Sequence, residues 1–145
     1  MNMTKKEALK KTRTIFWLQA AIAIALIILF ETNFIRFSIS GTYSYITDVA
    51  GIMLTLLIIP VAIKGFTAQM NKAVRKKIPH LIEYYYTRSS ARCSLIFFVI
   101  IANIVLYYSG NTNALYCGMF GVAAAIYSYP IEDAIDNYLQ KQKEE

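Results

Sequence analysis

Apolar residues in this sequence gather into four blocks that are separated by polar stretches. Within the blocks the hydrophobic positions follow no period, and segments such as AIAIALIILF and LIFFVIIANIVLYY are apolar on every face. A half-buried strand would alternate apolar and polar residues, and an amphipathic helix would keep a polar face. The blocks therefore predict helices that meet apolar groups on all sides. Their expected ranges are about 14–31, 46–66, 93–109 and 114–129.

Helices of this kind are typical of a membrane protein. A bilayer core of about 30 Å needs about 20 helical residues, with about 17 as a lower limit, so the shorter blocks have to stand nearly upright. A transmembrane β-barrel would show period-two alternation, which is missing here. Composition agrees, because 57% of the residues are hydrophobic and only 17% are charged. The sequence predicts an all-α fold, a single domain over residues 1–145 that forms an antiparallel bundle of four transmembrane helices.

Basic residues lie almost entirely on one side of this predicted bundle. Five precede the first helix, seven fall between helices two and three, two lie in the C-terminal tail, and Arg36 alone lies on the other side. Short basic loops stay in the cytoplasm, so both termini are expected there. This distribution explains the net charge of +6 without a nucleic-acid partner. It favours contact with the bilayer and its anionic inner-leaflet lipid instead, for which the candidate residues are Lys72, Arg75, Lys76 and Lys77.

The polar connections also carry helical and strand patterns. The cytoplasmic loop, 67–92, begins as an amphipathic helix that is expected to lie on the membrane surface, and a second helical stretch from Leu81 runs into helix three. The tail, 130–145, predicts an amphipathic cytoplasmic helix. Its acidic residues oppose the basic cluster at 72–77 in sign, so we expect tail and loop to form a cap. Segment 32–45 predicts either a small hairpin or an interfacial loop.

Few polar side chains fall inside the blocks, and these are the candidate site residues. Asn103 of helix three and Thr55 of helix two lie at similar depth, and we expect Asn103 to face the bundle interior. The two residues line a polar site or form an interhelical hydrogen bond. Pro60 removes one backbone hydrogen bond and predicts a kink in helix two, which acts as a hinge or is a fixed shape.

Small residues form a seam along helix four, at alternating spacings of four and three. The seam consists of Ala114, Gly118, Gly121, Ala125 and Ser128. Such seams let helix backbones approach closely, and close packing is a main source of helix association in lipid. The spacing does not decide whether the seam closes the bundle or joins two protomers.

No motif predicts a catalytic residue, a metal ligand or a cofactor. His80 and Glu83 lie one helical turn apart, but a metal site needs more ligands than this pair offers. Cys93 and Cys117 fall near opposite ends of the membrane helices, so we expect no disulfide between them.

Three sequence runs resemble small bacterial four-helix inner-membrane proteins that have no assigned activity. These runs are IPVAIKGF, YYYTRSSARCSLI and the closing helix that ends in YSYP. The resemblance covers helices two to four. It implies a multi-pass protein of the bacterial cytoplasmic (inner) membrane and implies no chemistry.

Three function classes stay open at this point. The first and favoured class is a non-enzymatic accessory or interaction protein of a membrane complex, which binds a second copy or another membrane protein. The second is a small oligomeric transporter or channel, which requires a polar cavity that reaches Asn103 and Thr55. The third is a lipid-active membrane enzyme, which requires reactive groups at the inner boundary, such as tyrosines, His80 or Arg88, around a lipid-sized groove.

Overall fold

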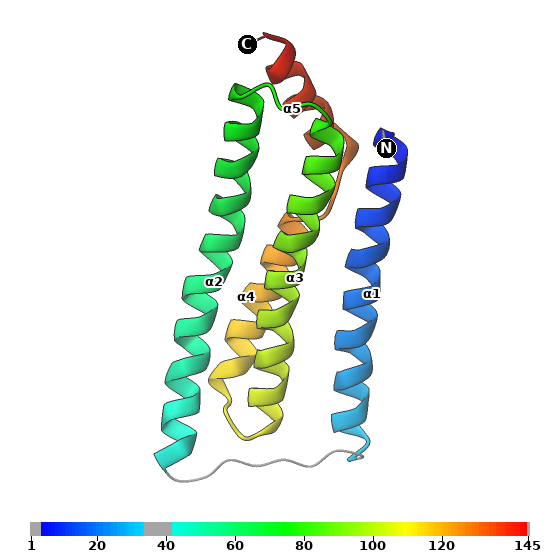
Figure 1. Cartoon of the computed structure of the whole chain (residues 1–145). Coiled ribbons are helices and arrows are strands. Elements are labelled where there is room, and N and C mark those ends of the chain that lie inside the picture. Colours follow the sequence, from blue (N-terminus) through cyan, green and yellow to red (C-terminus); the bar gives the residue numbers. More distant parts are fainter. Residues whose placement is uncertain (1–3, 34–41, 145) are drawn as a thin grey trace.

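The computed structural model describes residues 4–33 and 42–144, which form five helices (Figure 1). They are α1 (Lys5–Glu31), α2 (Thr42–Arg75), α3 (Leu81–Tyr108), α4 (Asn113–Tyr127) and α5 (Glu132–Glu144). The predicted all-α fold is confirmed. Helices α1, α2 and α3 are each long and apolar enough to cross a membrane. A fourth span is completed only by α4 and α5 together, which are bent by 59° at the break between them.

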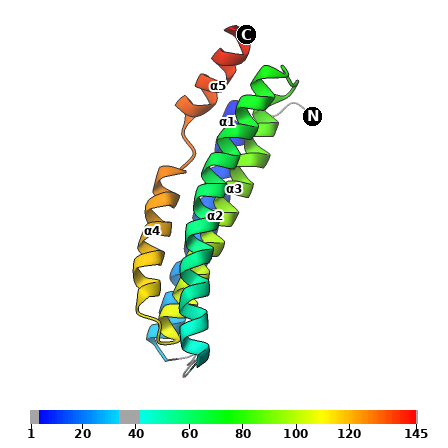
Figure 2. The same ribbon diagram turned by 90° about the vertical axis from the view of Figure 1, so that its left-hand side faces the viewer.

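Three of the helices lie side by side in one layer, with α3 between α1 and α2, and α4 packs on one face of that layer (Figures 1 and 2). Helix α4 covers α2 and α3 but not α1, because no Cα atom described in α1 lies within 8 Å of one in α4. Beyond the break, α5 contacts α2, α3 and α1 at one end of the layer. The face of the layer on which α4 packs is therefore crossed by α5 at one end. Elsewhere α4 covers only the half of that face that α2 and α3 form.

The long helices extend well past a bilayer core. Helix α2 has 34 residues and continues unbroken through Pro60, so it is about 50 Å long at 1.5 Å per residue. The prediction of a separate surface helix after residue 66 is wrong, because residues 67–75 continue α2 directly. The physical reason is burial: Phe66, Met70 and Val74 are buried within the protein, where they are shielded from water more completely than on a membrane surface.

Two clusters of buried side chains hold the helices together. The first joins α1, α2, α3 and α4 and contains Phe16, Ala23, Ile59, Ala62, Cys93, Ile96, Phe97, Val99, Ile100, Ala124 and Ala125. The second joins the ends of α1, α2 and α3 to α5 and contains Leu9, Phe66, Met70, Ala73, Val74, Leu81, Tyr85 and Ile135. We call residues 14–31, 45–65 and 93–131 the membrane zone, and residues 4–13, 66–92 and 132–144 the cap.

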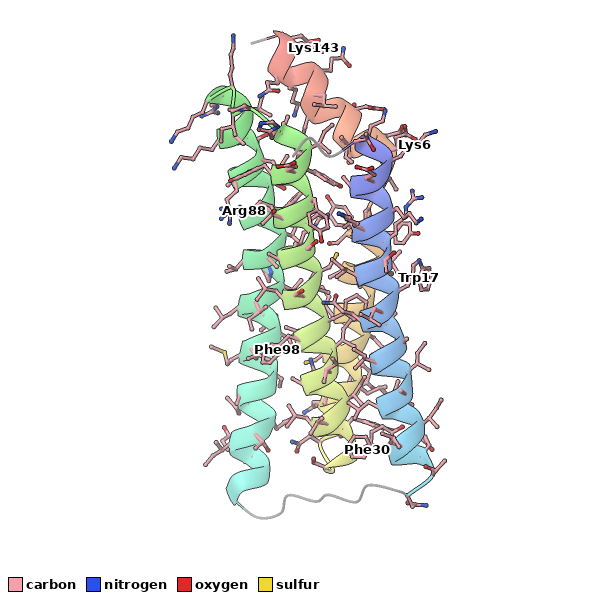
Figure 3. All side chains as sticks on the ribbon, turned by 45° about the vertical axis from the view of Figure 1, so that its right-hand side comes forward. Lys6, Trp17, Phe30, Arg88, Phe98 and Lys143 are labelled. Atoms are coloured by element: carbon pink, nitrogen blue, oxygen red, sulfur yellow. The ribbon has the colours of Figure 1, made fainter. Side chains whose placement is uncertain are left out.

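The surfaces of these two regions differ in kind. Every large apolar side chain that is exposed in the described residues lies in the membrane zone, within 17–29, 45–61, 95–107 and 115–131. The cap instead exposes charged side chains, among them Lys6 and Lys143, whereas Phe98 lies on the membrane zone (Figure 3). Exposed leucine and isoleucine on this scale are stable only where water is absent.

The second half of segment 32–45, for which the sequence predicts a hairpin or an interfacial loop, is helical instead. Helix α2 already begins at Thr42, so Tyr43 and Tyr45 are helical. A helix pairs its backbone groups within one segment, which suits a chain that is about to enter lipid. The rest of the predicted hairpin falls on residues 34–41 and lies outside the described residues.

Candidate functional site

Asn103 and Thr55 meet in the interior of the membrane zone. The side-chain amide of Asn103 donates to Thr55 Oγ1 at 2.9 Å and to the carbonyl of Val99 at 3.0 Å, and Thr55 donates to the carbonyl of Gly51 at 2.9 Å. Both side chains are at least 98% buried. The pair forms an interhelical hydrogen bond between α2 and α3, and its donor groups are all engaged within the chain.

The small-residue seam of α4 faces the interior of the protein. A Cβ atom added at Gly121 would lie 2.9 Å from Ile100 Cγ1 of α3, and one at Gly118 would lie 3.7 Å from the Cβ of Asn103. The other members of the seam are buried as well: Ala114, Ala125 and Ser128. The seam is therefore where the backbone of α4 approaches α3.

The remaining candidates lie on the surface of the protein. Pro60 is exposed on α2, in a helix that stays unbroken. The four basic residues proposed as lipid contacts are exposed at the end of the cap: Lys72, Arg75, Lys76 and Lys77. Because α2 runs on past the membrane zone, they lie roughly 10–15 Å along the helix beyond Phe66. Attraction to a lipid surface is screened by salt over a similar distance.

A groove runs between α1 and α4 along the membrane zone. It encloses about 700 Å³, and α3 forms its floor with residues that include Phe97, Ile100 and Ile104. Several of the wall residues are small: Ala20 and Ala23 on α1, and Ala114, Gly118, Ala123 and Ala125 on α4. The groove exists because α1 packs on α3 without reaching α4. Among the described residues its lining contains no charged side chain, and its polar members are Asn103, Trp17, Tyr107 and Tyr108.

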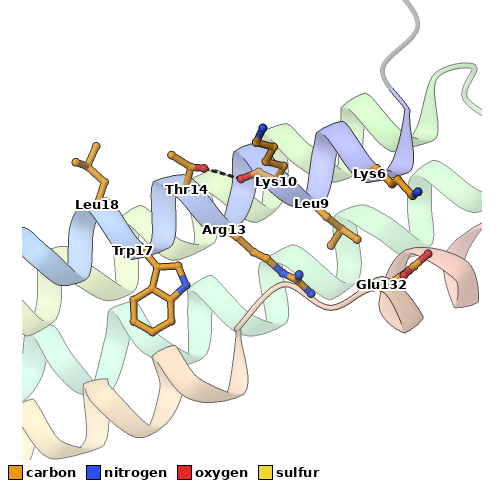
Figure 4. A pocket seen from close by; sticks show the side chains of 8 residues that line it. All are labelled: Lys6, Leu9, Lys10, Arg13, Thr14, Trp17, Leu18 and Glu132. Carbon is orange, nitrogen blue, oxygen red and sulfur yellow. Dashed lines mark hydrogen bonds between the residues drawn. The ribbon is translucent and has the colours of Figure 1, made fainter.

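A second pocket, which we call the basic pocket, adjoins the groove at its cap end (Figure 4). It has a volume of about 800 Å³ and is lined by Lys6, Leu9, Lys10, Arg13, Thr14, Trp17, Leu18 and Glu132. Trp17 borders both the groove and the basic pocket. Arg13 and Trp17 point from α1 toward the connection between α4 and α5 (Figure 4).

Two arginines bind the end of α4 near this pocket. Arg13 Nε donates to the carbonyl of Pro130 at 3.2 Å, and Arg92 Nη2 donates to the carbonyl of Ser128 at 3.1 Å. The last carbonyls of a helix lack partners within the helix and carry partial negative charge, so cations are favourable there. This role cannot be read from the sequence, in which both arginines lie at the ends of apolar blocks, where basic residues are expected as topology signals.

The acidic start of α5 pairs with α1. Lys5 Nζ lies 2.9 Å from Glu132 Oε1 and 2.7 Å from Asp136 Oδ1. Glu132 and Asp136, whose charge is opposite in sign to that of the basic cluster at 72–77, thus form their ion pairs with α1 instead. The connection from α4 is short, so it places the first turn of α5 beside α1 rather than beside the end of α2. The bonds to Asp136 and Glu132 raise the pKa of Lys5 above 10.5.

The apolar stripe of α5 is buried in the cap as expected, with one exception. Ile135 is 99% buried, and Ala134, Tyr138 and Leu139 pack around the same cluster. Ile131 precedes the helix and is half exposed. The tail therefore packs against the inner connection, as the cap hypothesis requires.

These features define the class of the protein but assign no chemistry to it. By helix length and hydropathy, the chain is a multi-pass helical membrane protein. Among the described residues, no three His, Cys, Asp or Glu side chains gather as a metal site would require. The chain matches no protein-family model, and neither a curated protein nor a solved structure is significantly similar to it.

Proposed function

We propose that the protein is a non-enzymatic accessory or interaction protein of a membrane complex, and that the groove between α1 and α4 receives a transmembrane helix of a partner protein. One observation carries this proposal. The layer of α1, α2 and α3 is covered by α4 over one half only, so a further helix seated on α1 and α3 would complete the second layer.

The walls of the groove suit a helix. Helix association in lipid depends on close backbone packing, which small residues permit. Ala20 on α1 and Gly118 and Ala123 on α4 leave room for a neighbouring backbone. Because the lining is mostly apolar, with Asn103 as its one amide side chain among the described residues, the partner segment is expected to be mostly apolar and to carry small residues on the face that enters the groove.

The charge distribution supports an orientation with both termini in the cytoplasm. Fourteen of the fifteen basic residues lie in the cap or within one turn of it, and Arg36 is the exception. This asymmetry is what orients multi-pass proteins during insertion. With the resemblance to small bacterial proteins, it favours the inner membrane of a bacterium as the location.

The other two function classes gain no comparable support. A transporter needs several polar groups that face a water-filled path. Asn103 borders the groove and its side-chain oxygen accepts no hydrogen bond from the described residues, but both of its N–H groups are bonded within the chain, and Thr55 is not part of the groove lining. A lipid-active enzyme needs reactive groups beside its groove. His80 and Arg88 belong to the cap and line neither the groove nor the basic pocket.

Adjacent alanines of α1 allow a matched test of the proposal. Ala20 lines the groove, whereas Ala21 is exposed on another face of the same helix. A photo-activated crosslinking residue at position 20 is expected to capture a membrane protein in native membranes, and the same residue at position 21 is expected to capture far less. Ala20→Trp should fill the groove and lower the yield of that partner in a mild-detergent pull-down, while Ala21→Trp should not.

Two results would contradict the proposal. Equal crosslinking from positions 20 and 21 would mean that the groove has no preferred neighbour. An unchanged partner yield with Ala20→Trp, for a variant that reaches the membrane at normal abundance, would place the partner on another surface.

A further inference from the structure

The basic pocket has a positively charged side and an apolar side. Lys6, Lys10 and Arg13 provide positive charge on the cap side, and Trp17 and Leu18 provide an apolar surface on the membrane side. Arg13 and Trp17 are four residues apart on α1, so only about 6 Å along the helix separates the two. A ligand that fills the pocket should therefore have an anionic group joined directly to an apolar segment.

The pocket keeps its positive character despite one acidic neighbour. Glu132 is the only carboxylate among the described lining residues, and it lies 2.9 Å from Lys5, which is outside the pocket. Lys5 also pairs with Asp136 at 2.7 Å, so it offsets the charge of Glu132 in part. Three cations remain for a bound anion.

Arg13 is held in place before any ligand arrives. Its Nε donates to the carbonyl of Pro130, and its guanidinium lies over the ring of Tyr129 at 5.6 Å from the centroid. Trp17 Nε1 in turn donates to the hydroxyl of Tyr129 at 3.4 Å. The two terminal nitrogens of Arg13 are the part of the fork that suits a phosphate, since guanidinium binds phosphate oxygens in pairs.

From the position of Trp17, we expect the pocket to lie at the depth of lipid headgroups. Indole rings favour the boundary between headgroups and hydrocarbon, and Trp17 is 59% exposed there. Below it, Leu18 and the rest of the exposed apolar face of α1 belong to the membrane zone. A phosphate beside Arg13 and an acyl chain along Trp17 and Leu18 would match this arrangement.

We propose that the basic pocket is a specific site for one anionic phospholipid, whose phosphate is bound by Lys6, Lys10 and Arg13 and whose acyl chain lies against Trp17 and Leu18. The site is distinct from the four exposed basic residues at the end of α2, none of which lines the basic pocket. It does not depend on a partner helix in the groove, so the purified full-length chain is sufficient to test it.

The single tryptophan of the chain makes the site directly measurable. The protein is placed in phosphatidylcholine vesicles that contain increasing fractions of phosphatidylglycerol, and one of the two lipids carries brominated acyl chains, which quench nearby tryptophan. Each basic residue near an anionic surface strengthens lipid binding about five-fold. We expect brominated phosphatidylglycerol to quench Trp17 saturably, with at least about a ten-fold preference over brominated phosphatidylcholine.

Two triple variants with the same change of charge separate this site from general surface attraction. Lys6→Gln/Lys10→Gln/Arg13→Gln should remove most of the preference, and Lys72→Gln/Lys76→Gln/Lys77→Gln should retain it. An equal loss in both variants, or no preference in the unmodified protein, would overturn the proposal. Far-UV circular dichroism checks that each variant keeps its helices.

A milder variant and a soluble anion complete the test. Arg13→Lys keeps the charge but lacks the planar fork, so the preference should fall several-fold without any loss of helix; an unchanged preference would remove Arg13 from the site. Inorganic phosphate in the millimolar range should leave the quenching unchanged. If phosphate abolishes the preference, the pocket binds a soluble anion and the assignment to a lipid is wrong.

Discussion

The membrane zone and the cap are built largely from the same three helices, yet they are assembled by different forces. In the membrane zone the exposed residues are apolar, for example Leu18 and Val61, and the backbones meet through small residues such as Gly121. In the cap the exposed residues are charged, and large side chains such as Phe66 and Tyr85 fill the interior. One helix can therefore pass from one packing regime to the other within a single turn.

The difference follows from the solvent around each region. Burial in the cap removes apolar surface from water, which stabilises by about 25 cal/mol per Å². Burial in the membrane zone only exchanges lipid contacts for protein contacts, so shape and close packing decide its stability. Gly121 is useful in the membrane zone because it lets α4 approach Ile100, whereas Phe66 is useful in the cap because of its area.

The largest expected effect comes from removing the cover of the cap. Deleting residues 131–145 removes Ile135, Tyr138 and Leu139 and exposes the part of the cap that they cover. A large apolar side chain contributes on the order of 1.5–3 kcal/mol when fully buried. We expect the unfolding temperature in detergent to fall strongly and protease to cut the cap first. Removing only residues 141–145 is the control and should have little effect. An unchanged unfolding temperature after the longer deletion would refute the account of the cap.

A matched pair of truncations compares the two regions directly. Ile135→Ala in the cap and Ile96→Ala in the membrane zone remove the same atoms from fully buried sites. We expect Ile135→Ala to lower the free energy of unfolding by about 2–4 kcal/mol, within the range for buried isoleucine in water. Ile96→Ala should cost about half as much or less in vesicles, because its methyl groups lose packing but no hydrophobic transfer. Equal losses would break the comparison.

The hydrogen bond between Asn103 and Thr55 is expected to contribute less than either truncation. Interhelical hydrogen bonds in membranes average about 0.6 kcal/mol. A double-mutant cycle with Thr55→Val and Asn103→Leu, measured by unfolding in detergent, should give a coupling energy of this order. A coupling near zero would mean that shape alone holds α2 against α3.

The smallest effect concerns the pH dependence of the cap. The carboxylates of Asp136 and Glu132 raise the pKa of Lys5 above 10.5, so their stabilising effect is complete below pH 10.5 and is lost as the pH rises through the raised value. Lys5→Met should therefore lower the unfolding temperature slightly at neutral pH, and the difference from the unmodified protein should shrink in alkali. A difference that stays constant above pH 10.5 would show that the pairs contribute nothing.

The sequence predicts which segments form helices but not how these helices pack against one another. Unbroken apolar runs such as LIFFVIIANIVLYY predict spanning helices because lipid leaves the backbone no alternative. The seam of α4 predicts close packing, but the identity of its neighbour depends on tertiary contacts such as that of Gly121 with Ile100. The separation of α1 from α4 has little local signal, because Gln19 is the one amide side chain among the apolar residues of α1 in the membrane zone, and its contact with Ser94 of α3 is visible only in the structure.

The basic pocket could not be predicted from the sequence either. Arg13 and Trp17 are each ordinary at the end of a membrane helix, where charge and aromatic rings are common. Their importance comes from Pro130 and Tyr129, which follow more than a hundred positions later and reach α1 only because α4 ends early. A long-range contact of this kind leaves no periodic trace in the sequence.

The short length of α4 has a consequence for the surrounding bilayer. Fifteen residues rise only about 22 Å, roughly 8 Å less than an average hydrocarbon core. The turn at Gly110 fixes one end of α4, and the arginine contacts at Ser128 and Pro130 fix the other. Because the membrane zone continues past α4 to residue 131, the non-helical residues 128–131 have to cover the remaining depth, whereas α2 needs no such extension. We expect a bilayer with a thinner hydrocarbon core to match the α4 side of the protein better than the α2 side.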